Sequence, residues 1–121
     1  MTEHRPVLLI EDHEDIRESM ALTLRLMGFA VEEAENGQVA LDKLRAGLVP
    51  CLILLDLTMP VMDGFMFRRQ QLQLAPVADV PVIVYSGLYD VNATIEQLGA
   101  VAGFQKPIEP KALVSLVQQH C

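Results

Sequence analysis

Three carboxylate residues in this sequence directly follow apolar runs that have the length of buried strands. Glu11 and Asp12 follow the run that starts at Val7, and Asp56 closes the run "CLILLD" at residues 51–56. Carboxylates that converge repel one another, and a hard divalent cation such as Mg²⁺, which prefers oxygen ligands, relieves that repulsion. A carboxylate can also attack phosphorus and form an aspartyl phosphate. The pattern therefore predicts a magnesium site and phosphoryl transfer wherever the fold brings these acids together.

A hydroxyl and an amine follow two further apolar runs. Ser86 lies at the end of the run at residues 80–87, and Lys106 follows the run at residues 101–105. Taken singly, such a serine is an ordinary turn residue, such a lysine is an ordinary surface charge, and the acidic stretch 11–15 is typical of a helix N-terminus. Together, an acid pair, a single aspartate, a hydroxyl and an amine match the groups that phosphoryl transfer uses. We therefore interpret the four strand ends as one site.

The elements that would position these groups alternate along the chain. Apolar runs of strand type are separated by stretches with helical periodicity, which predicts βαβ units and a parallel sheet. Such sheets bind ligands beyond the carboxyl ends of their strands, where these polar groups are found. The fold class is therefore α/β, with three layers around a five-stranded parallel sheet. The expected strands are 7–11, 29–35, 51–56, 80–87 and 101–105, and the expected helices are 15–28, 37–47, 64–74, 91–100 and 109–120.

Composition narrows the functional class. The 121 residues fit a single domain spanning 1–121, with a net charge of −7 and a hydrophobic content of 51%. The most basic stretch is the pair Arg68–Arg69, so no nucleic-acid surface is expected. No run approaches the roughly 20 apolar residues of a membrane span, and the N-terminus lacks the pattern of a signal peptide. We therefore expect a cytoplasmic protein without membrane contact.

The two cysteines, Cys51 and Cys121, do not form the pattern of a disulfide framework. Cys51 opens a predicted core strand and is interpreted as a small buried hydrophobe, while Cys121 is the last residue. Both are expected to be reduced, as is usual in a cytosolic protein.

Four motifs of the sequence are similar to those of the receiver domain of two-component response regulators. The resemblance extends from Val7 to about His120 and implies a flavodoxin-like (βα)5 fold with strand order 2-1-3-4-5. The motifs are "LLIEDHEDIRE" at residues 8–18, "LLDLTMPVMDGFMF" at residues 54–67, "VIVYSG" at residues 82–87 and "GFQKPI" at residues 103–108.

The resemblance also implies a role for each site residue. Asp56 would be the phosphoacceptor, Lys106 would contact the phosphoryl group, and Ser86 stands where the family has its switch Ser or Thr. The peptide bond that follows Lys106 is expected to be cis, as in the family. Mg²⁺ would be held by Asp12 and Asp56 directly, by Glu11 through water, and by the backbone carbonyl of Thr58.

The sequence departs from the family at one position. Family members usually carry Tyr or Phe three residues before the lysine, as a conformational switch, whereas this chain has Gly103 there, followed by Phe104. Because side chains alternate along a strand, Phe104 would point to the other face. Either the strand register shifts locally, or the usual coupling between Ser86 and an aromatic residue is absent. We expect that the conformational switch formed by this aromatic residue is degraded in this chain.

Two further positions follow the site residues at equal spacing. Thr58 and Leu88 lie two residues beyond Asp56 and Ser86, where the family controls the access and orientation of the hydrolytic water. Leu88 is apolar and cannot orient water, which predicts a long-lived phosphoryl group.

The resemblance implies a sensor histidine kinase or a histidine phosphotransfer protein as the phosphoryl donor, docked near the first helix and the loop after the fifth strand. An effector protein, a covalently linked domain and a second copy of the chain, forming a homodimer, are the other partners that it suggests. The chain is not expected to be an enzyme beyond its own phosphorylation and dephosphorylation.

Three other interpretations stay open. A phosphatase of the haloacid dehalogenase type also uses a strand-end aspartate and Mg²⁺, but it carries a general acid where this chain has Thr58. A flavodoxin-like module that binds a nucleotide or flavin would need a glycine-rich loop where this chain has "EDHED" at residues 11–15. A receiver-like scaffold that is never phosphorylated is compatible with Gly103, although the acceptor residues are present.

Overall fold

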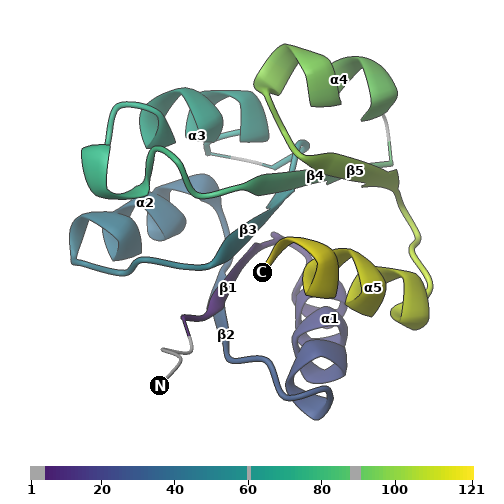
Figure 1. The fold of residues 1–121 in the computed structure, drawn as a ribbon. Helices are drawn as coiled ribbons and strands as arrows, with labels where there is room; N and C mark the ends of the chain where they lie inside the picture. Colours follow the sequence, from purple (N-terminus) through teal and green to yellow (C-terminus); the bar gives the residue numbers. More distant parts are fainter. Residues whose placement is uncertain (1–4, 60, 88–90) are drawn as a thin grey trace.

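Strands and helices alternate through residues 5–59, 61–87 and 91–121, which this computed structural model describes (Figure 1). Each predicted element is present, and most begin or end a few residues inside the predicted range. The strands are β1 (Val7–Ile10), β2 (Val31–Ala34), β3 (Leu52–Asp56), β4 (Val82–Ser86) and β5 (Ala102–Gln105). The helices are α1 (Glu14–Leu26), α2 (Gly37–Arg45), α3 (Gly64–Gln71), α4 (Val91–Leu98) and α5 (Pro110–His120), with a short 3₁₀ helix at Ala75–Val77.

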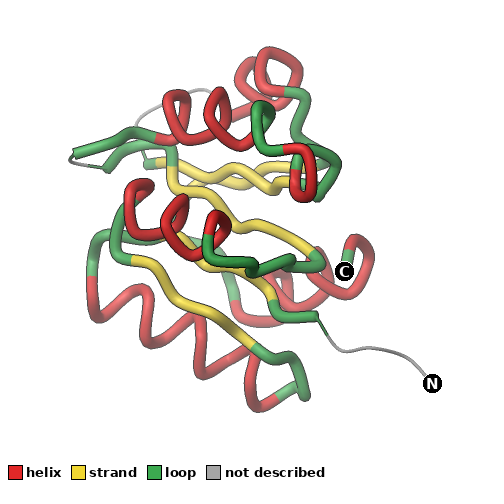
Figure 2. The backbone as a smooth tube through the Cα atoms, turned by 90° about the vertical axis from the view of Figure 1, so that its left-hand side faces the viewer, coloured by secondary structure: helices red, strands yellow, loops and turns green. Residues whose placement is uncertain are grey.

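The strands form one parallel sheet in the order β2-β1-β3-β4-β5, which confirms the predicted order. Helices α1 and α5 cover one face of the sheet, and α2, α3 and α4 cover the other (Figure 1). The side view shows the sheet between these two helix layers (Figure 2). The chain therefore has the expected three-layer, flavodoxin-like α/β fold.

Two apolar clusters fill the space between the sheet and its helices. Leu8 and Ile10 of β1 pack toward α2, α3 and α4, whereas Val7 and Leu9 pack toward α1 and α5. This division follows from the alternation of side chains along a strand, and it explains why the central strands are continuously apolar. Burying one such side chain stabilises the fold by about 1.5–3 kcal/mol. The clusters thus give the polar strand ends a rigid support.

The pair Asp63–Gly64 starts α3 close to the end of β3. Asp63 Oδ1 accepts a hydrogen bond from the backbone N–H of Met66 at 2.9 Å, which caps the helix. A Cβ atom at Gly64 would lie 2.8 Å from the backbone oxygen of Asp56 and 2.8 Å from Cα of Leu57. Glycine therefore lets α3 approach the backbone of Asp56.

Helix α4 packs directly on β5 at Gly103. A Cβ atom at Gly103 would lie 2.4 Å from Val91 Cγ1 and 2.9 Å from Ile95 Cγ1. The pairing of β5 with β4 is regular and sets Phe104 opposite Tyr85, so the strand register does not shift. Phe104 points away from α4 and packs in the cluster beneath α1 and α5, as the alternation of side chains predicts.

Replacing Gly103 with alanine is expected to lower the free energy of unfolding by about 1–3 kcal/mol, the usual cost of an overpacked core. The added methyl group would have to move α4 because its nearest neighbours are side chains of that helix. Urea unfolding measures the difference. Gly87→Ala is the matched control, since among the described residues its Cβ would meet only Lys106 Cβ at 3.9 Å, an ordinary contact. Equal losses in the two variants would refute the steric explanation.

The expectation that the two cysteines are reduced and unlinked is wrong. Cys51 and Cys121 form a disulfide with their Cα atoms 5.1 Å apart. The fold brings them together because α5 runs back along the sheet, so that its C-terminal end reaches the start of β3. Cys51 is only half-buried, so it is not the core hydrophobe that its strand position predicts. The crosslink ties the last turn of α5 to the end of the sheet opposite Asp56.

The pair Arg68–Arg69 does not form a basic surface. The Arg68 side chain is largely buried, and its guanidinium donates hydrogen bonds to the backbone oxygens of Leu98 at 2.9 Å and Gly99 at 3.3 Å. Burial lowers the pKa of Arg68 from its ordinary value. Arg68 therefore anchors the end of α4 on α3. Its guanidinium binds backbone oxygens inside the fold and is not part of a charged surface.

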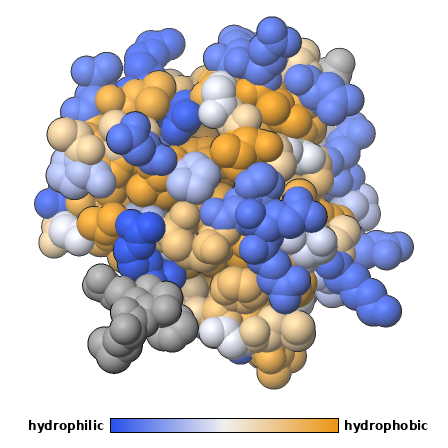
Figure 3. Space-filling view, in the orientation of Figure 1, coloured by the Kyte–Doolittle hydropathy of each residue, from blue (hydrophilic) through white to orange (hydrophobic). Residues whose placement is uncertain are grey.

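Hydrophobic and hydrophilic side chains both reach the face shown in Figure 3. The largest exposed apolar side chains near the C-terminal end of α1 are Leu22, Leu26 and Met27.

Within the part of the chain that the structure describes, no helix combines the length and the apolar character needed to cross a membrane.

Candidate phosphoacceptor and metal site

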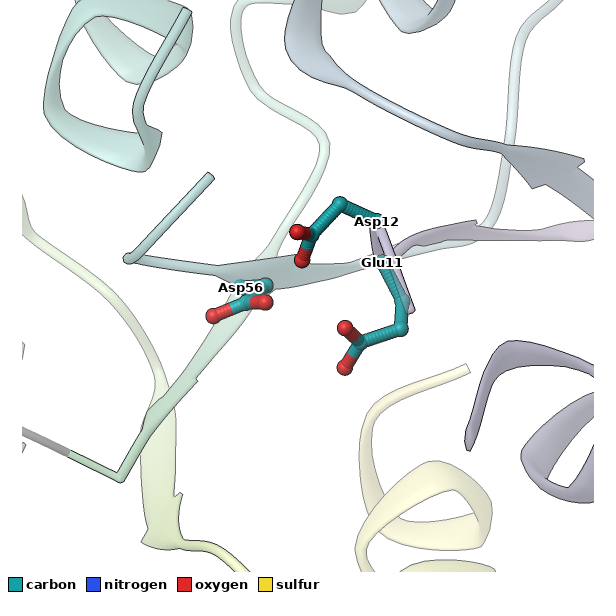
Figure 4. Close-up of side chains that lie close together, drawn as sticks. All are labelled: Glu11, Asp12 and Asp56. Carbon is teal, nitrogen blue, oxygen red and sulfur yellow. The ribbon is translucent and has the colours of Figure 1, made fainter. Parts of the chain in front are cut away.

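The carboxyl ends of β1 and β3 bring three acidic side chains together. Glu11 and Asp12 follow β1, and Asp56 is the last residue of the neighbouring strand β3. Each offers a carboxylate oxygen within 4.8 Å of the others, and Figure 4 shows the three side chains at one edge of the sheet. Glu11 and Asp56 are fully buried, whereas Asp12 is exposed. Oxygen donors in this arrangement are the kind that Mg²⁺ binds.

Glu11 is oriented by its backbone surroundings. Its Oε2 accepts a hydrogen bond from the N–H of His13 at 3.1 Å, and Arg17 donates to its backbone carbonyl at 2.9 Å. As far as the described residues go, the buried Oε1 atom accepts no hydrogen bond, although Lys106 Nζ lies 3.1 Å away. A buried carboxylate oxygen without a hydrogen bond is costly. The residues present therefore fit a metal ion bound among the acids.

Asp56 receives hydrogen bonds on both of its oxygens. Oδ1 accepts from the backbone N–H of Thr58 at 3.1 Å, and Oδ2 accepts from Lys106 Nζ at 3.0 Å. Lys106 follows β5, and the peptide bond between Lys106 and Pro107 is cis, as predicted. Its ammonium group also pairs with Glu11. One cation thus lies between two fully buried carboxylates.

These contacts change the acidity of the site. The pKa of Asp56 is raised from 3.8 to about 7, mainly because burial disfavours the charged form. The charge of Glu11 also acts to raise this pKa, while the hydrogen bond from Thr58 and the contact with Lys106 act to lower it. Burial lowers the pKa of Lys106, but the hydrogen bond to Asp56 and the ion pair with Glu11 outweigh this and leave the pKa above its ordinary value. Lys106 therefore stays charged at neutral pH, whereas metal-free Asp56 holds a proton more firmly than an exposed aspartate does.

The raised pKa of Asp56 predicts how the stability of the metal-free protein depends on pH. Below about pH 4 the group is protonated in the folded and unfolded states alike. Between pH 4 and its folded pKa of about 7, the folded state binds more protons than the unfolded state, so this group lowers the free energy of unfolding as the pH rises. Urea unfolding in EDTA should therefore show a larger loss from pH 5 to pH 8 in the wild type than in Asp56→Asn. Equal losses of stability in the two proteins would show that ionisation of Asp56 does not destabilise the fold.

Two hydroxyl groups lie beside the acid cluster. Thr58 Oγ1 and Ser86 Oγ are 3.4 Å apart, and either group could donate the proton of this contact. Ser86 is buried at the end of β4, and Thr58 follows β3. The four predicted strand ends thus meet at one edge of the sheet. Leu88, on which the predicted slow loss of phosphate depends, lies outside the described residues.

The interpretation of the sequence missed Tyr85. This residue of β4 is fully buried, and its ring stacks on Phe104 with 4.8 Å between the centroids and an interplanar angle of 3°. The ammonium of Lys106 lies 5.3 Å from the centroid of the Tyr85 ring. In an apolar run a tyrosine looks like an ordinary core residue. The available signal is its hydroxyl, which needs a partner when it is buried in a central strand.

A cavity of about 300 Å³ adjoins the site on the side of α1. Its lining is mostly apolar and comes from α1, from Tyr85 of β4, from β5 and from the connection between β5 and α5. The residues that line it include Ile16, Met20, Phe104, Lys106, Pro107 and Ile108. The amine that contacts Asp56 therefore also borders an opening on the surface.

A flavodoxin-like domain with acids at the carboxyl ends of β1 and β3, a hydroxyl at the end of β4 and a lysine after β5 defines a class of signalling domain, and the comparisons with known proteins agree. The family model described as "Response regulator receiver domain" matches residues 7–118. The chain therefore belongs to the response regulator receiver domain family of two-component systems.

Known proteins similar to this chain include transcriptional regulators and chemotaxis proteins. It is 33% identical over 114 residues to a probable transcriptional regulator ycf27 of Porphyridium aerugineum, covering 93% of this chain and 46% of that protein. It is 31% identical to the transcriptional regulatory protein FixJ of Bradyrhizobium diazoefficiens, covering 98% of this chain and 57% of FixJ. The solved structure of chemotaxis protein CheY4 of Vibrio cholerae matches with a TM-score of 0.88 and 26% identity, covering 98% of this chain and 100% of CheY4. The chain thus spans about half the length of these curated relatives and the whole of a CheY-like structure.

Proposed function

We propose that residues 1–121 act as one receiver domain, in which Asp56 accepts a phosphoryl group from a phosphohistidine donor with the aid of Mg²⁺. The observation that carries the proposal is the surroundings of Asp56. Its buried carboxylate ends a central strand, contacts the amine of Lys106 at 3.0 Å, and lies in a cluster with two further acids. The proposal thus takes Asp56 as the nucleophile, Lys106 as the cation for the phosphoryl oxygens and the three acids as the metal ligands.

In the proposed transfer, an ionised oxygen of Asp56 attacks the phosphorus atom of the donor. The phosphorus–nitrogen bond breaks, its electron pair returns to the donor imidazole, and the phosphoryl group becomes an acyl phosphate on Asp56. Lys106 leaves Oδ2 of Asp56 to pair with a phosphoryl oxygen, and the hydroxyl of Ser86 donates a hydrogen bond to another. Bound Mg²⁺ would neutralise charge on the phosphoryl oxygens. We assign it to Glu11, Asp12, Asp56 and the backbone carbonyl of Thr58.

The proposed partners follow from the surfaces around Lys106. A sensor histidine kinase or histidine phosphotransfer protein would dock over the apolar cavity between α1 and the connection from β5 to α5. An effector protein, a linked domain or a second copy of the chain would respond to the phosphorylated state. We further propose that the protein works in the cytoplasm, where the disulfide between Cys51 and Cys121 would be an exception to the usual reduced state of cysteines. We also propose that it has no contact to nucleic acid through this domain or to membranes, and that it catalyses no reaction beyond its own phosphorylation and dephosphorylation.

Intact-mass measurement after incubation with acetyl phosphate and Mg²⁺ tests the proposal. The wild type is expected to gain the mass of one phosphoryl group, and Asp56→Asn is expected to gain none. The gain should also disappear from the wild type in excess EDTA. The same gain in both proteins would move the acceptor elsewhere, and no gain in the wild type would favour a receiver-like scaffold that is not phosphorylated.

A further inference from the structure

Tyr85 contacts each of the strands that carry the acid cluster. It lies opposite Asp56 in the pairing of β3 with β4, and its backbone oxygen accepts a hydrogen bond from the N–H of Leu57 at 3.0 Å. Its hydroxyl crosses to β1 and donates to the carbonyl of Ile10 at 3.1 Å. One residue thus joins the two strands: its backbone pairs with the strand of Asp56, and its side chain reaches the strand that leads into Glu11.

The ring of Tyr85 lies beside the amine that contacts both buried acids. Lys106 Nζ is 5.3 Å from the ring centroid, within the range of a cation–π contact. Lys106 Nζ lies 3.0 Å from Asp56 Oδ2 and 3.1 Å from Glu11 Oε1. The ring of Tyr85 is therefore its third contact, after the two carboxylates. A lysine side chain is flexible, and such contacts determine where its charge lies.

Phe104 fixes the plane of the Tyr85 ring. The two rings are stacked within 3° of parallel, and they lie opposite each other in the pairing of β4 with β5. Tyr85 is fully buried, so the stack and the hydrogen bond to Ile10 together leave its ring one orientation. The absence of a side chain at Gly103 does not affect this pair, which lies on the opposite face of the sheet.

We propose that Tyr85 is a positioning residue for phosphoryl transfer: its ring holds the ammonium of Lys106, and its hydroxyl holds the end of β1 that carries Glu11 and Asp12. The inference rests on the proposed function of Asp56. In this role Tyr85 sets the distance between the amine of Lys106 and the acids, although it contacts neither the phosphoryl group nor the metal.

The placement of Lys106 can be tested in the wild-type protein by NMR, without any phosphorylation. Ring currents of Tyr85 should shift the ε-methylene protons of Lys106 upfield from those of Lys111, which is exposed on α5. Tyr85→Phe should keep this shift because it keeps the ring. Tyr85→Leu should bring the Lys106 signal to the position of Lys111. Coincident signals for the two lysines in the wild type would overturn the proposal.

Kinetics and metal binding test the effect on the site. With acetyl phosphate, Tyr85→Leu is expected to lower the maximal phosphorylation rate about tenfold, the scale of one cation–π contact, with little change in the half-saturating concentration. Tyr85→Phe should recover most of this rate. It should still bind Mg²⁺ more weakly than the wild type, because the hydrogen bond to Ile10 is lost. Wild-type rates in Tyr85→Leu would refute the positioning role.

Two features keep this test separate from that of the proposed function. If the wild type takes up no phosphate, the proposed function fails, while the NMR shift and the Mg²⁺ titration still decide the role of Tyr85. If Tyr85→Leu does not fold, Phe104→Leu replaces it, since removing the stacked partner should move the Lys106 signal toward that of Lys111. A Lys106 signal that is unchanged in Phe104→Leu would contradict the role of the stack.

Discussion

Replacing Lys106 with methionine is expected to lower the free energy of unfolding of the metal-free protein by about 2 kcal/mol at pH 8. The side chain of Lys106 compensates Glu11 and Asp56, which are both fully buried. Removing one partner of a buried ion pair typically costs about 3–5 kcal/mol because the remaining charge has no partner. The expected value is smaller here, since 27% of the Lys106 side chain is exposed and solvent screens part of the interaction.

Added Mg²⁺ should restore part of the stability that Lys106→Met loses. A divalent cation among the acids compensates their charges in place of the amine. The free energies of unfolding of the wild type and Lys106→Met should therefore differ less in Mg²⁺ than in EDTA. Urea unfolding in both solutions measures the effect. Lys111→Met is the matched control, because Lys111 is exposed and its loss should change stability by less than about 0.5 kcal/mol. A loss in Lys106→Met that does not depend on Mg²⁺ would mean that packing, and not charge, explains it.

Replacing Cys121 with serine is expected to lower the free energy of unfolding by about 4 kcal/mol, the estimate for a crosslink that closes a loop of this length. The disulfide joins residues separated by 70 positions, so it removes many conformations from the unfolded chain. For a domain of 121 residues, a loss of this size lowers the melting temperature by about 15 °C. Thermal unfolding followed by circular dichroism would show it.

A reducing agent separates the crosslink from other effects of the substitution. It should destabilise the wild type to the level of Cys121→Ser and leave that variant unchanged. Cys51→Ser should behave like Cys121→Ser, because either change breaks the same bond. A wild type that melts at the same temperature with and without reductant would show that the disulfide does not stabilise the protein.

The sequence predicts most of the fold because the sheet is buried on both faces. Continuous apolar runs such as residues 51–56 identify central strands, and the more polar β2 indicates an edge. The pairing of Cys51 with Cys121 could not be predicted in this way. It depends on where α5 ends relative to β3, which is a matter of packing across 70 residues of sequence.

The location of the candidate site is predictable for a related reason. Parallel strands place their carboxyl ends at one edge, so residues as distant as Glu11, Asp56 and Lys106 must meet once the strand order is known. The surroundings of the amine are harder to predict. The stack of Tyr85 on Phe104 depends on the exact pairing of two strands, and the close fit of Gly103 depends on the path of α4.

Both ends of the described chain are fastened at the same place. The backbone N–H of Cys51 donates a hydrogen bond to the carbonyl of Pro6 at 2.9 Å, and Cys121 is joined to the side chain of Cys51. This place is the start of β3, at the end of the sheet away from Asp56. A fluorescent reporter fused to either terminus would therefore keep clear of the candidate phosphoacceptor Asp56, and a circular permutant that joins the old termini with a short linker should retain the acid cluster.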